Sequence, residues 1–288
     1  MSPPTVDPGM SDVADREWRL IRDEPRDGPT QMALEEVAGR TAVERGVRTV
    51  RTYSWEPGTV SLGYRNEASA IDREFCEREG IGLTRRQTGG GAIYHDARGD
   101  ISYTIVAPSE EVPGDLMACY ELFCEPILEG LRRMGVDADF AARERPAIHE
   151  PSCYLRGIDP AHDVVAPAGE ADARKISGNA QYRRNDVVIQ HGSISYELVP
   201  ERHLGVFADA DASVDRFRER VTGVREVSSI DREAAVALLG DALGEWCDAT
   251  EGSWWTDELE AARELADRKY GAEAWIRDRE RHEPPTSR

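Results

Sequence analysis

The sequence predicts an α+β fold, with mixed or antiparallel sheets flanked by helices and a short helical C-terminal tail. The strand-like segments come in adjacent pairs, and the helical segments come singly between them. A doubly wound parallel fold would instead alternate strand and helix along the whole chain. The chain has 288 residues, of which 40% are hydrophobic, so it can bury a sizeable core and is not a disordered chain.

The N-terminal half supplies the first strands and helices, each predicted from the period of its apolar residues and from its turn residues. In order, we expect a strand after residue 17, a helix over 31–45, two strands around a Pro-Gly turn within 47–64, a helix over 67–80, a strand over 81–87 and a strand over 100–108.

The C-terminal half begins with a long helix over 115–135, in which Pro126 predicts a kink or a break. The elements expected after it are a strand within 136–142, a loop over 143–172 that contains a strand at 162–166, two strands within 174–198 joined by a turn at 183–186, and helices over 214–221, 230–246 and 256–276.

Four parts follow from this pattern: a disordered leader over 1–16, a main domain over 17–228, a helical extension over 229–279 and a disordered tail over 280–288. No apolar run is long enough to cross a bilayer, and the N-terminus lacks a secretory pattern. Five cysteines without a CxxC pair favour reduced thiols. We therefore expect a cytoplasmic protein with no membrane partner.

The charge of the chain excludes one class of partner. The formal net charge is −19 and the pI is about 4.8, which repels nucleic acid. Such an acidic surface also suits concentrated salt, where screening shortens the reach of self-repulsion. We expect a halophilic source, and an activity that falls in molar salt would contradict this.

Lysine is scarce in the chain. Only Lys175 and Lys269 are lysines among 36 basic residues, and the other 34 are arginine. In such a chain, a lysine indicates a position at which the planar guanidinium of arginine cannot replace the ammonium group of lysine. Lys269 has a simple structural explanation near the end of a predicted helix, where positive charge favours the helix dipole.

The first candidate site is the stretch "RRQTGGGAIYHD" at 85–96. Gly89–Gly91 follow a predicted strand, so their backbone N–H groups can approach a ligand closely and form a concave anion site, with Arg85 and Arg86 beside it. The run matches neither GxxxxGKS/T nor GxGxxG. A tight turn with solvated arginines is the alternative, and the nearby His95 and Asp96 favour a site.

The second candidate site is the pair of segments "RKISGNAQ" and "QHGS". Lys175 lies on a predicted strand, where Gly178 and Ala180 leave room beside it, which suits a point-charge contact to a carbonyl or phosphate oxygen. An exposed strand lysine is the alternative. His191 is either a polar wall of the same site or a core histidine.

Cys153 lies in a predicted loop about twenty residues before Lys175. A cysteine carries acyl groups where a nearby cation or histidine favours its thiolate, and His149 and Lys175 are the candidates for that role. The alternative is an inert thiol.

These motifs resemble the lipoate–protein ligase catalytic-domain family, in the superfamily that also holds biotin–protein ligases and octanoyl transferases. The family hallmark, Arg-Arg-x-Ser/Thr-Gly-Gly-Gly-Ala-Val-Tyr-His-Asp, is similar to "RRQTGGGAIYHD" here. A Lys-x-Ser/Ala-Gly-Asn/Ser-Ala block with a following His-Gly is similar to "KISGNAQ" and "QHGS". The short helical C-terminal part resembles the archaeal-type ligases, so the resemblance implies that family's α+β catalytic domain over 17–228.

The resemblance implies an ATP-dependent ligase that converts lipoate to lipoyl-AMP and transfers the acyl group to a lysine of a lipoyl domain. Lys175 would be its catalytic residue, ATP and implied Mg²⁺ its cofactors, with no metal ligands identified. Implied partners are the 2-oxoacid dehydrogenase E2 and the glycine cleavage H protein, with a small accessory ligase subunit. The implied binding residues are Arg86, Thr88, Gly89, Gly90, Gly91, Ala92, Tyr94, His95, Asp96, Gly178, Asn179, Ala180, His191 and Gly192.

Two alternatives remain open. The first is a cysteine-dependent octanoyl or lipoyl transferase, which would work without ATP through a thioester on Cys153. The intact "GGGAIYHD" favours the ligase over this transferase. The second is a lipoyl-binding module without turnover, which the full set of polar residues disfavours.

Overall fold

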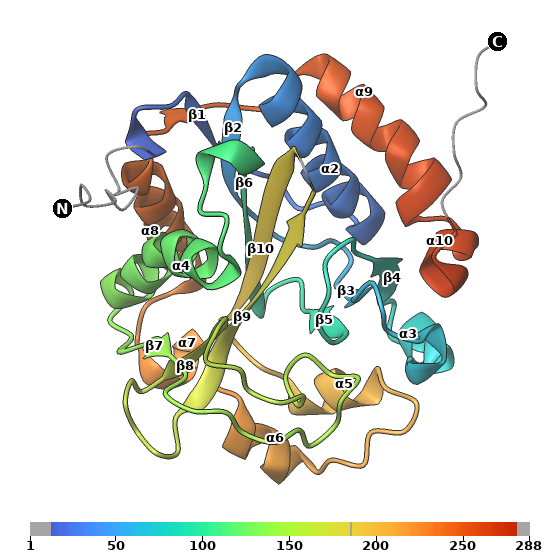
Figure 1. Cartoon of the computed structure of the whole chain (residues 1–288). Coiled ribbons are helices and arrows are strands. Elements are labelled where there is room, and N and C mark those ends of the chain that lie inside the picture. Colours follow the sequence, from blue (N-terminus) through green and yellow to red (C-terminus); the bar gives the residue numbers. More distant parts are fainter. Residues whose placement is uncertain (1–12, 185, 281–288) are drawn as a thin grey trace.

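A computed structural model of the protein describes residues 13–184 and 186–280, and these residues form two β-sheets with helices packed on their outer faces (Figure 1). Both sheets are mixed, so the predicted α+β class with mixed sheets and flanking helices is confirmed.

The large sheet has eight strands in the order β11-β1-β2-β6-β10-β9-β8-β7. The strands from β11 to β2 are parallel, and all later neighbours are antiparallel. The β9–β10 pair confirms the hairpin expected within 174–198. The strands are β1 (Trp18–Arg22), β2 (Arg48–Tyr53), β6 (Asp100–Pro108), β7 (Asp139–Phe140), β8 (Asp163–Ala166), β9 (Arg174–Arg183), β10 (Val187–Ser195) and β11 (Thr250–Glu251).

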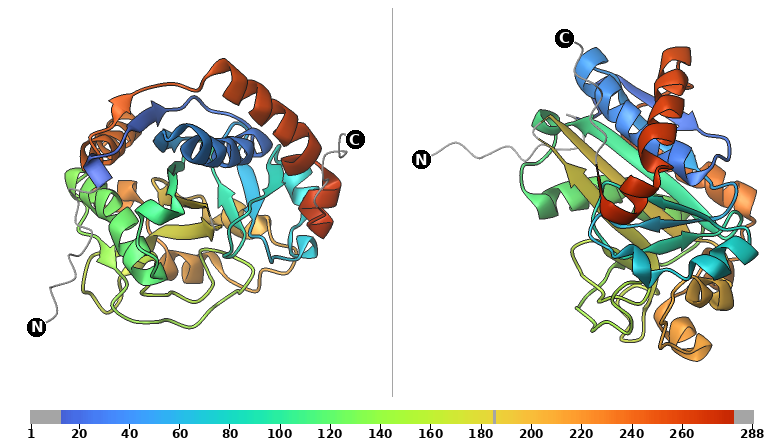
Figure 2. Two further views of the ribbon diagram at one scale, coloured as in Figure 1. Left: turned by 45° about the horizontal axis from the view of Figure 1, so that its top comes forward. Right: turned by 90° about the vertical axis from the view of Figure 1, so that its right-hand side faces the viewer.

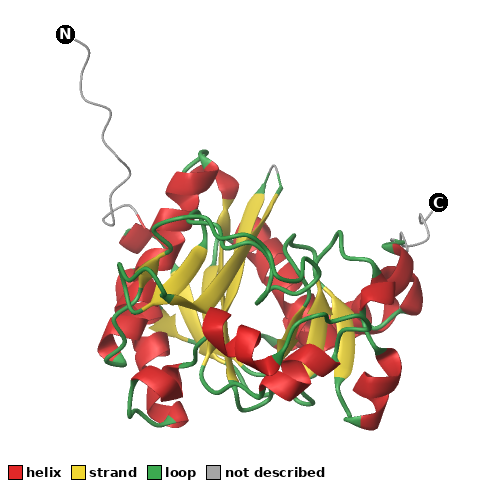
Figure 3. Ribbon diagram, turned by 90° about the horizontal axis from the view of Figure 1, so that it is seen from below, coloured by secondary structure: helices red, strands yellow, loops and turns green. Residues whose placement is uncertain are grey.

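The small sheet lies beside the large one, as seen from below in Figure 3. Its order is β4-β3-β5, with β3 (Thr59–Leu62) parallel to β4 (Gly82–Arg85) and antiparallel to β5 (Ile93–His95). The two strands expected within 47–64 therefore do not pair with each other. The segment between them contains the buried Trp55, and it carries the chain from the large sheet to the small one.

Helices cover both faces of the large sheet. α4 and α8 pack on one face over a core of apolar side chains, and α2 and α9 lie side by side on the other (Figure 2). The helices are α2 (Gly28–Arg45), α3 (Arg73–Arg78), α4 (Leu116–Arg133), α5 (Pro200–Gly205), α6 (Val214–Arg220), α7 (Val224–Val227), α8 (Arg232–Trp246), α9 (Thr256–Leu265) and α10 (Glu273–Asp278).

Three predicted helices differ from the structure in extent. The helix expected over 67–80 begins only at Arg73, because Asp72 caps it by accepting a hydrogen bond from the N–H of Phe75. α4 runs without a break through Pro126, which lies on its buried face. The helix expected over 256–276 changes to a π-helical turn over Ala266–Tyr270 and then restarts as α10.

The residues after 228 belong to the same fold as those before. α8 packs against α4, and β11 adds an edge strand to the large sheet. At the other end, Val13 is buried and its carbonyl accepts a hydrogen bond from Trp18, while the rest of the leader (1–12) and of the tail (281–288) lies outside the described residues. Within the described ranges, every helix is too short or too polar to cross a membrane.

Candidate active site

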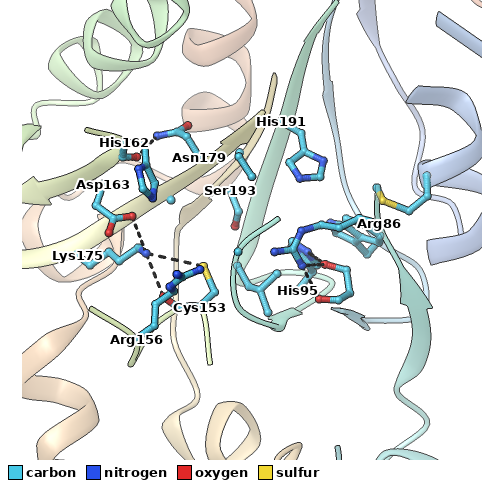
Figure 4. A pocket seen from close by; sticks show the side chains of 18 of the residues that line it. Arg86, His95, Cys153, Arg156, His162, Asp163, Lys175, Asn179, His191 and Ser193 are labelled. Carbon is cyan, nitrogen blue, oxygen red and sulfur yellow. Dashed lines mark hydrogen bonds and ion pairs between the residues drawn. The ribbon is translucent and has the colours of Figure 1, made fainter. Parts of the chain in front are cut away.

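A cavity lies between the two sheets, with an empty volume of about 530 Å³ that includes its opening to solvent (Figure 4). β9 and β10 of the large sheet and β3 and β5 of the small sheet supply its walls, and α2 closes one end. Its lining residues are Met32, Tyr53, Trp55, Ser61, Arg86, Gly90, Ile93, His95, Cys153, Arg156, His162, Asp163, Lys175, Gly178, Asn179, Ala180, His191, Gly192 and Ser193.

One side of the cavity carries the cysteine and the lysine. We call Cys153, Arg156, His162, Asp163 and Lys175 the cysteine wall. The Lys175 Nζ donates to the Cys153 carbonyl oxygen at 3.0 Å and lies 3.8 Å from its Sγ. It also pairs with the Asp163 carboxylate at 2.8 Å, and both side chains are almost fully buried. A cation thus lies beside the thiol, as an acyl-carrying cysteine requires.

Lys175 is held as an ammonium group. Burial alone would lower its pKa, but the Asp163 carboxylate and the Cys153 sulfur offset burial, and the pKa of Lys175 is raised above its ordinary value. Lys175 therefore carries its charge at neutral pH and lies beside Sγ as a buried cation.

Strand pairing brings Asp163 close to Lys175. β8 begins at Asp163 and pairs antiparallel with β9, and an irregularity between Val164 and Val165 shifts their register. The predicted room beside Lys175 is confirmed at Gly178. A Cβ at that position would lie 3.1 Å from Lys175 Cε and 3.4 Å from Cys153 Sγ. A side chain at position 178 would crowd both Lys175 and Cys153.

The loop that carries Cys153 is fastened to the glycine run. The Cys153 N–H donates to the Ala92 carbonyl at 2.7 Å, and the Ala92 N–H donates to the Pro151 carbonyl at 2.6 Å. A Cβ on Gly91 would lie 2.6 Å from the Cys153 nitrogen. Gly91 is therefore needed for the close approach of two backbone segments.

The other side of the cavity is built on the glycine run. We call Arg86, Gly90, His95 and His191 the glycine wall. The Arg86 guanidinium, with its Nε–H included, donates five hydrogen bonds within the protein. The acceptors are Thr88 Oγ1, the carbonyl and hydroxyl oxygens of Ser61, and the carbonyls of Gly89 and Gly91. Burial lowers the pKa of Arg86 to about 10. Arg86 thus holds the glycine run in shape.

Arg85 does not flank the cavity as expected. Its side chain is fully buried and donates to backbone carbonyls of the segment 63–66 and of Ile276, so it ties α10 to the small sheet. The prediction that both arginines add charge beside an anion site is therefore wrong for Arg85.

The two histidines of the glycine wall are hydrogen-bonded at both ring nitrogens. His191 lies between Glu35 at 3.0 Å and Thr88 at 2.8 Å. Burial opposes the charge on Glu35, but His191 and Arg51 offset it, and the pKa of Glu35 is lowered. His95 lies between Asp100 at 3.0 Å and Ser61 at 2.9 Å, and burial lowers the pKa of His95.

The structure brings most of the predicted site residues together. His191 lines the cavity, so it is a polar wall of the site and not a histidine enclosed in the core. The residues that line the cavity as expected are Arg86, Gly90, His95, Cys153, Lys175, Gly178, Asn179, Ala180, His191 and Gly192.

The remaining predicted residues lie around the cavity. Thr88 and Ala92 lie behind its walls, through the contacts given above. Gly89 and Gly91 line an adjoining groove, together with Arg65 and Arg156.

Three residues are wrongly placed by the sequence. Tyr94 donates to Asp96 at 3.0 Å, and Asp96 accepts from the backbone of the following turn, so both lie away from the cavity. His149 packs its ring on Phe207 and does not line the cavity with Cys153. A residue close to a motif in the sequence can still point its side chain to the opposite side of the strand or loop.

Several lining residues were missed. His162 and Asp163 carried a usable signal, because an adjacent histidine and aspartate precede a predicted strand shortly before Lys175. The apolar residues carried none, since core and cavity walls have the same composition. The missed residues are Met32, Tyr53, Trp55, Ser61, Ile93, Arg156, His162, Asp163 and Ser193.

A thiol beside a buried cation, in a cavity between two mixed sheets, is the arrangement of an enzyme site for acyl chemistry. The family described as the lipoyl protein ligase A/B catalytic domain matches residues 27–244, and the chain belongs to this family. The resemblance found in the motifs is thereby confirmed.

Relatives within the family have two different activities. An octanoyltransferase LipM of Kyrpidia tusciae is 32% identical over 90% of this chain and 97% of its own length. The structure of a bi-partite lipoate protein ligase from Thermoplasma acidophilum superposes with a TM-score of 0.76 at 25% identity, covering 93% of this chain and 99% of that one. A lipoate-protein ligase A bound with ATP superposes at 0.73 with 26% identity, covering 90% and 98%.

Proposed function

We propose that the protein is an octanoyltransferase that carries the acyl group as a thioester on Cys153. The observation that carries this proposal is the 3.8 Å approach of Cys153 Sγ to the buried ammonium of Lys175 inside the cavity. The relatedness to octanoyltransferases along nearly their full length supports it. This function was the alternative in the sequence-based prediction, and it is now better supported than the ligase.

The chemistry proceeds in two exchanges. The Cys153 thiolate attacks the carbonyl carbon of an octanoyl thioester on a carrier protein and a new C–S bond forms. The C–S bond to the carrier breaks, and the carrier leaves as a thiolate that takes a proton from water. The ε-amine of a lysine on a lipoyl domain then attacks the same carbon, giving an amide and free Cys153. Lys175 stabilises the negative charge on sulfur in both exchanges.

The ATP-dependent lipoate ligase is the second candidate. One observation favours it: among the described residues, the N–H groups of Gly89–Gly91 donate to no protein acceptor, and these glycines line the adjoining groove, where a phosphate could bind. The fit to ATP and Mg²⁺ is otherwise poor. Arg86 has no N–H group to spare, and the described chain has no cluster of three acidic, histidine or cysteine side chains for a metal.

The proposed acceptors are the lipoyl domain of a 2-oxoacid dehydrogenase E2 and the glycine cleavage H protein. A structural relative is described together with its E2 lipoyl domain, which supports this class of partner. The five cysteines are all unpaired, which is consistent with the proposed cytoplasmic location.

The experiment supplies octanoyl carrier protein without ATP and measures the mass of the Cys153 peptide. We expect an increase equal to one octanoyl group, which Cys153→Ala removes. In parallel, lipoate and ATP are supplied and pyrophosphate is measured. Pyrophosphate release that persists in Cys153→Ala, with no acyl group on Cys153 in the wild type, would overturn the transferase in favour of the ligase.

A further inference from the structure

The second exchange needs a group that accepts a proton. The acceptor amine must lose a proton as its nitrogen bonds to the thioester carbon, and a positioned base near the reacting atoms accelerates such steps. Lys175 does not fit this role, because Asp163 holds it as an ammonium group. The base must therefore be sought elsewhere in the cavity, and this search rests on the proposed transferase function.

The glycine wall offers no free base. Arg86 donates to Ser61 and Thr88, so these hydroxyls point their own hydrogens at His95 Nε2 and His191 Nε2. The Nδ1 atoms of these two histidines face the carboxylates of Asp100 and Glu35. Both nitrogens of each ring are thus already hydrogen-bonded, so neither histidine has a free nitrogen to accept a proton.

His162 differs from both. Within the described part of the chain, neither of its ring nitrogens has a partner at hydrogen-bond distance, and the Asp159 carboxylate is 3.9 Å from Nδ1. The ring stacks on Tyr120 with centroids 5.4 Å apart, and Asn179 donates to the His162 backbone carbonyl at 2.8 Å. These contacts fix the position of the ring and leave its nitrogens available.

His162 also connects the cavity to the surface. It lines the cavity that contains Cys153 Sγ, and it lines an open groove on the other side of the loop with Glu144, Glu150 and Asp159. About a quarter of its side chain is exposed, at 27%. A proton taken up inside the cavity can therefore leave to solvent, and a lysine side chain can enter from this groove, where three carboxylates outnumber Arg145 and Arg156.

We propose that His162 is the general base that deprotonates the acceptor lysine. The amine nitrogen bonds to the thioester carbon, its proton passes to a ring nitrogen of His162, and the C–S bond breaks with its electrons on Cys153 Sγ beside the Lys175 ammonium. The imidazolium then releases its proton to water, and the Asp159 carboxylate stabilises the charge in the meantime.

The electrostatics of the ring suit a base. Burial lowers the pKa of His162 below its ordinary value, so the imidazole is neutral and able to accept a proton at pH 7. The charged and titratable groups that face it are Asp163 and Asp159, which raise its pKa, Lys175 and Arg156, which lower it, and the stacked Tyr120.

The test separates the two exchanges. Octanoyl-Cys153 enzyme is prepared first, and its decay on addition of a lipoyl domain is followed by rapid quench and mass spectrometry. His162→Asn should slow this aminolysis about 100-fold or more, while acylation of Cys153 by octanoyl carrier protein stays near the wild-type rate. In the wild type, the aminolysis rate should fall on acidification, with its midpoint below the ordinary histidine pKa of about 6.5, as the imidazole becomes protonated.

Matched variants exclude a merely structural role. His149→Asn removes an imidazole that lies outside the cavity and should leave both rates unchanged. In His162→Gly, added imidazole should restore part of the aminolysis rate. Equal losses in the two exchanges, or an unchanged aminolysis rate in His162→Asn, would overturn the role of His162. If the wild type forms no thioester on Cys153 at all, the proposed function itself fails.

Discussion

The two walls of the cavity use polar residues in opposite ways. On the glycine wall, Arg86, His95 and His191 are each hydrogen-bonded to neighbouring protein groups throughout. On the cysteine wall, Cys153 and His162 face the cavity with free polar atoms, and Lys175 reaches the sulfur (Figure 4). Side chains whose polar atoms are all hydrogen-bonded hold the shape of a wall, whereas side chains with unpaired polar atoms are available to a substrate.

This difference assigns separate roles to the two sequence motifs. The glycine motif, which dominates the resemblance to the family, builds a rigid wall and a docking edge for the cysteine loop. The residues proposed to react come from the less regular segment around 153–163 and from Lys175. A motif that identifies a family is thus not the same as the set of residues that carries out a reaction.

The largest effect is expected at Lys175. Lys175→Arg keeps the charge, but the site is closed by Asp163 and by the backbone at Gly178, and the planar guanidinium does not fit it. Octanoyl transfer should fall at least about 100-fold. The other lysine provides the control, because Lys269 pairs with the mostly buried carboxylate of Glu36 at 2.7 Å and lines no part of the cavity. Near-normal octanoyl transfer by Lys175→Arg would show that the cysteine wall does not require a lysine, and would contradict the difference between the two walls.

A smaller effect is expected where the walls meet. Gly91→Ala places a Cβ 2.6 Å from the Cys153 nitrogen, and should lower the free energy of unfolding by about 1–3 kcal/mol and slow thioester formation. Gly89→Ala is the control. A Cβ there would meet no atom within 4 Å, so the free energy of unfolding should change by less than about 0.5 kcal/mol. Denaturant unfolding measures both, and equal values would show that the loop does not depend on this contact.

The smallest effect is expected behind the glycine wall. Glu35→Gln replaces a charge-assisted hydrogen bond to His191 with a neutral one, and should cost about 1 kcal/mol of stability at pH 7. The folded-state pKa of Glu35 is lowered, so its contribution is present above about pH 4.5 and is lost as pH falls through the lowered pKa. The stability difference between wild type and variant should therefore shrink on acidification. A constant difference would contradict this assignment.

The fold was predictable to the extent that local pattern determines it. The β9–β10 hairpin and the helices α6 and α8 follow directly from period and turn residues. The separation of β2 from β3 into different sheets does not, because pairing depends on contacts far apart in sequence. The two-residue strand β11 is too short to have a period at all.

The site was predictable where composition was unusual. Lys175 stood out as one of two lysines, and Gly178 as the room beside it. Cys153 was a candidate, but its partner was ambiguous, because only the folded chain shows that Lys175 rather than His149 reaches it. His162 was missed because its place next to Asp163 at the start of a predicted strand does not by itself show that the two line the same cavity as Lys175.

The backbone hydrogen bonds that fasten the cysteine loop to Ala92 have a consequence for dynamics. Such loops on many enzymes order only when substrate arrives, and part of the binding free energy is then lost to that ordering. Here the nucleophile is joined to the pocket by main-chain amides at 2.6 and 2.7 Å before any ligand binds. The amide protons of Ala92 and Cys153 should therefore exchange with solvent as slowly as those of a central strand, in an enzyme that has not yet met its substrate.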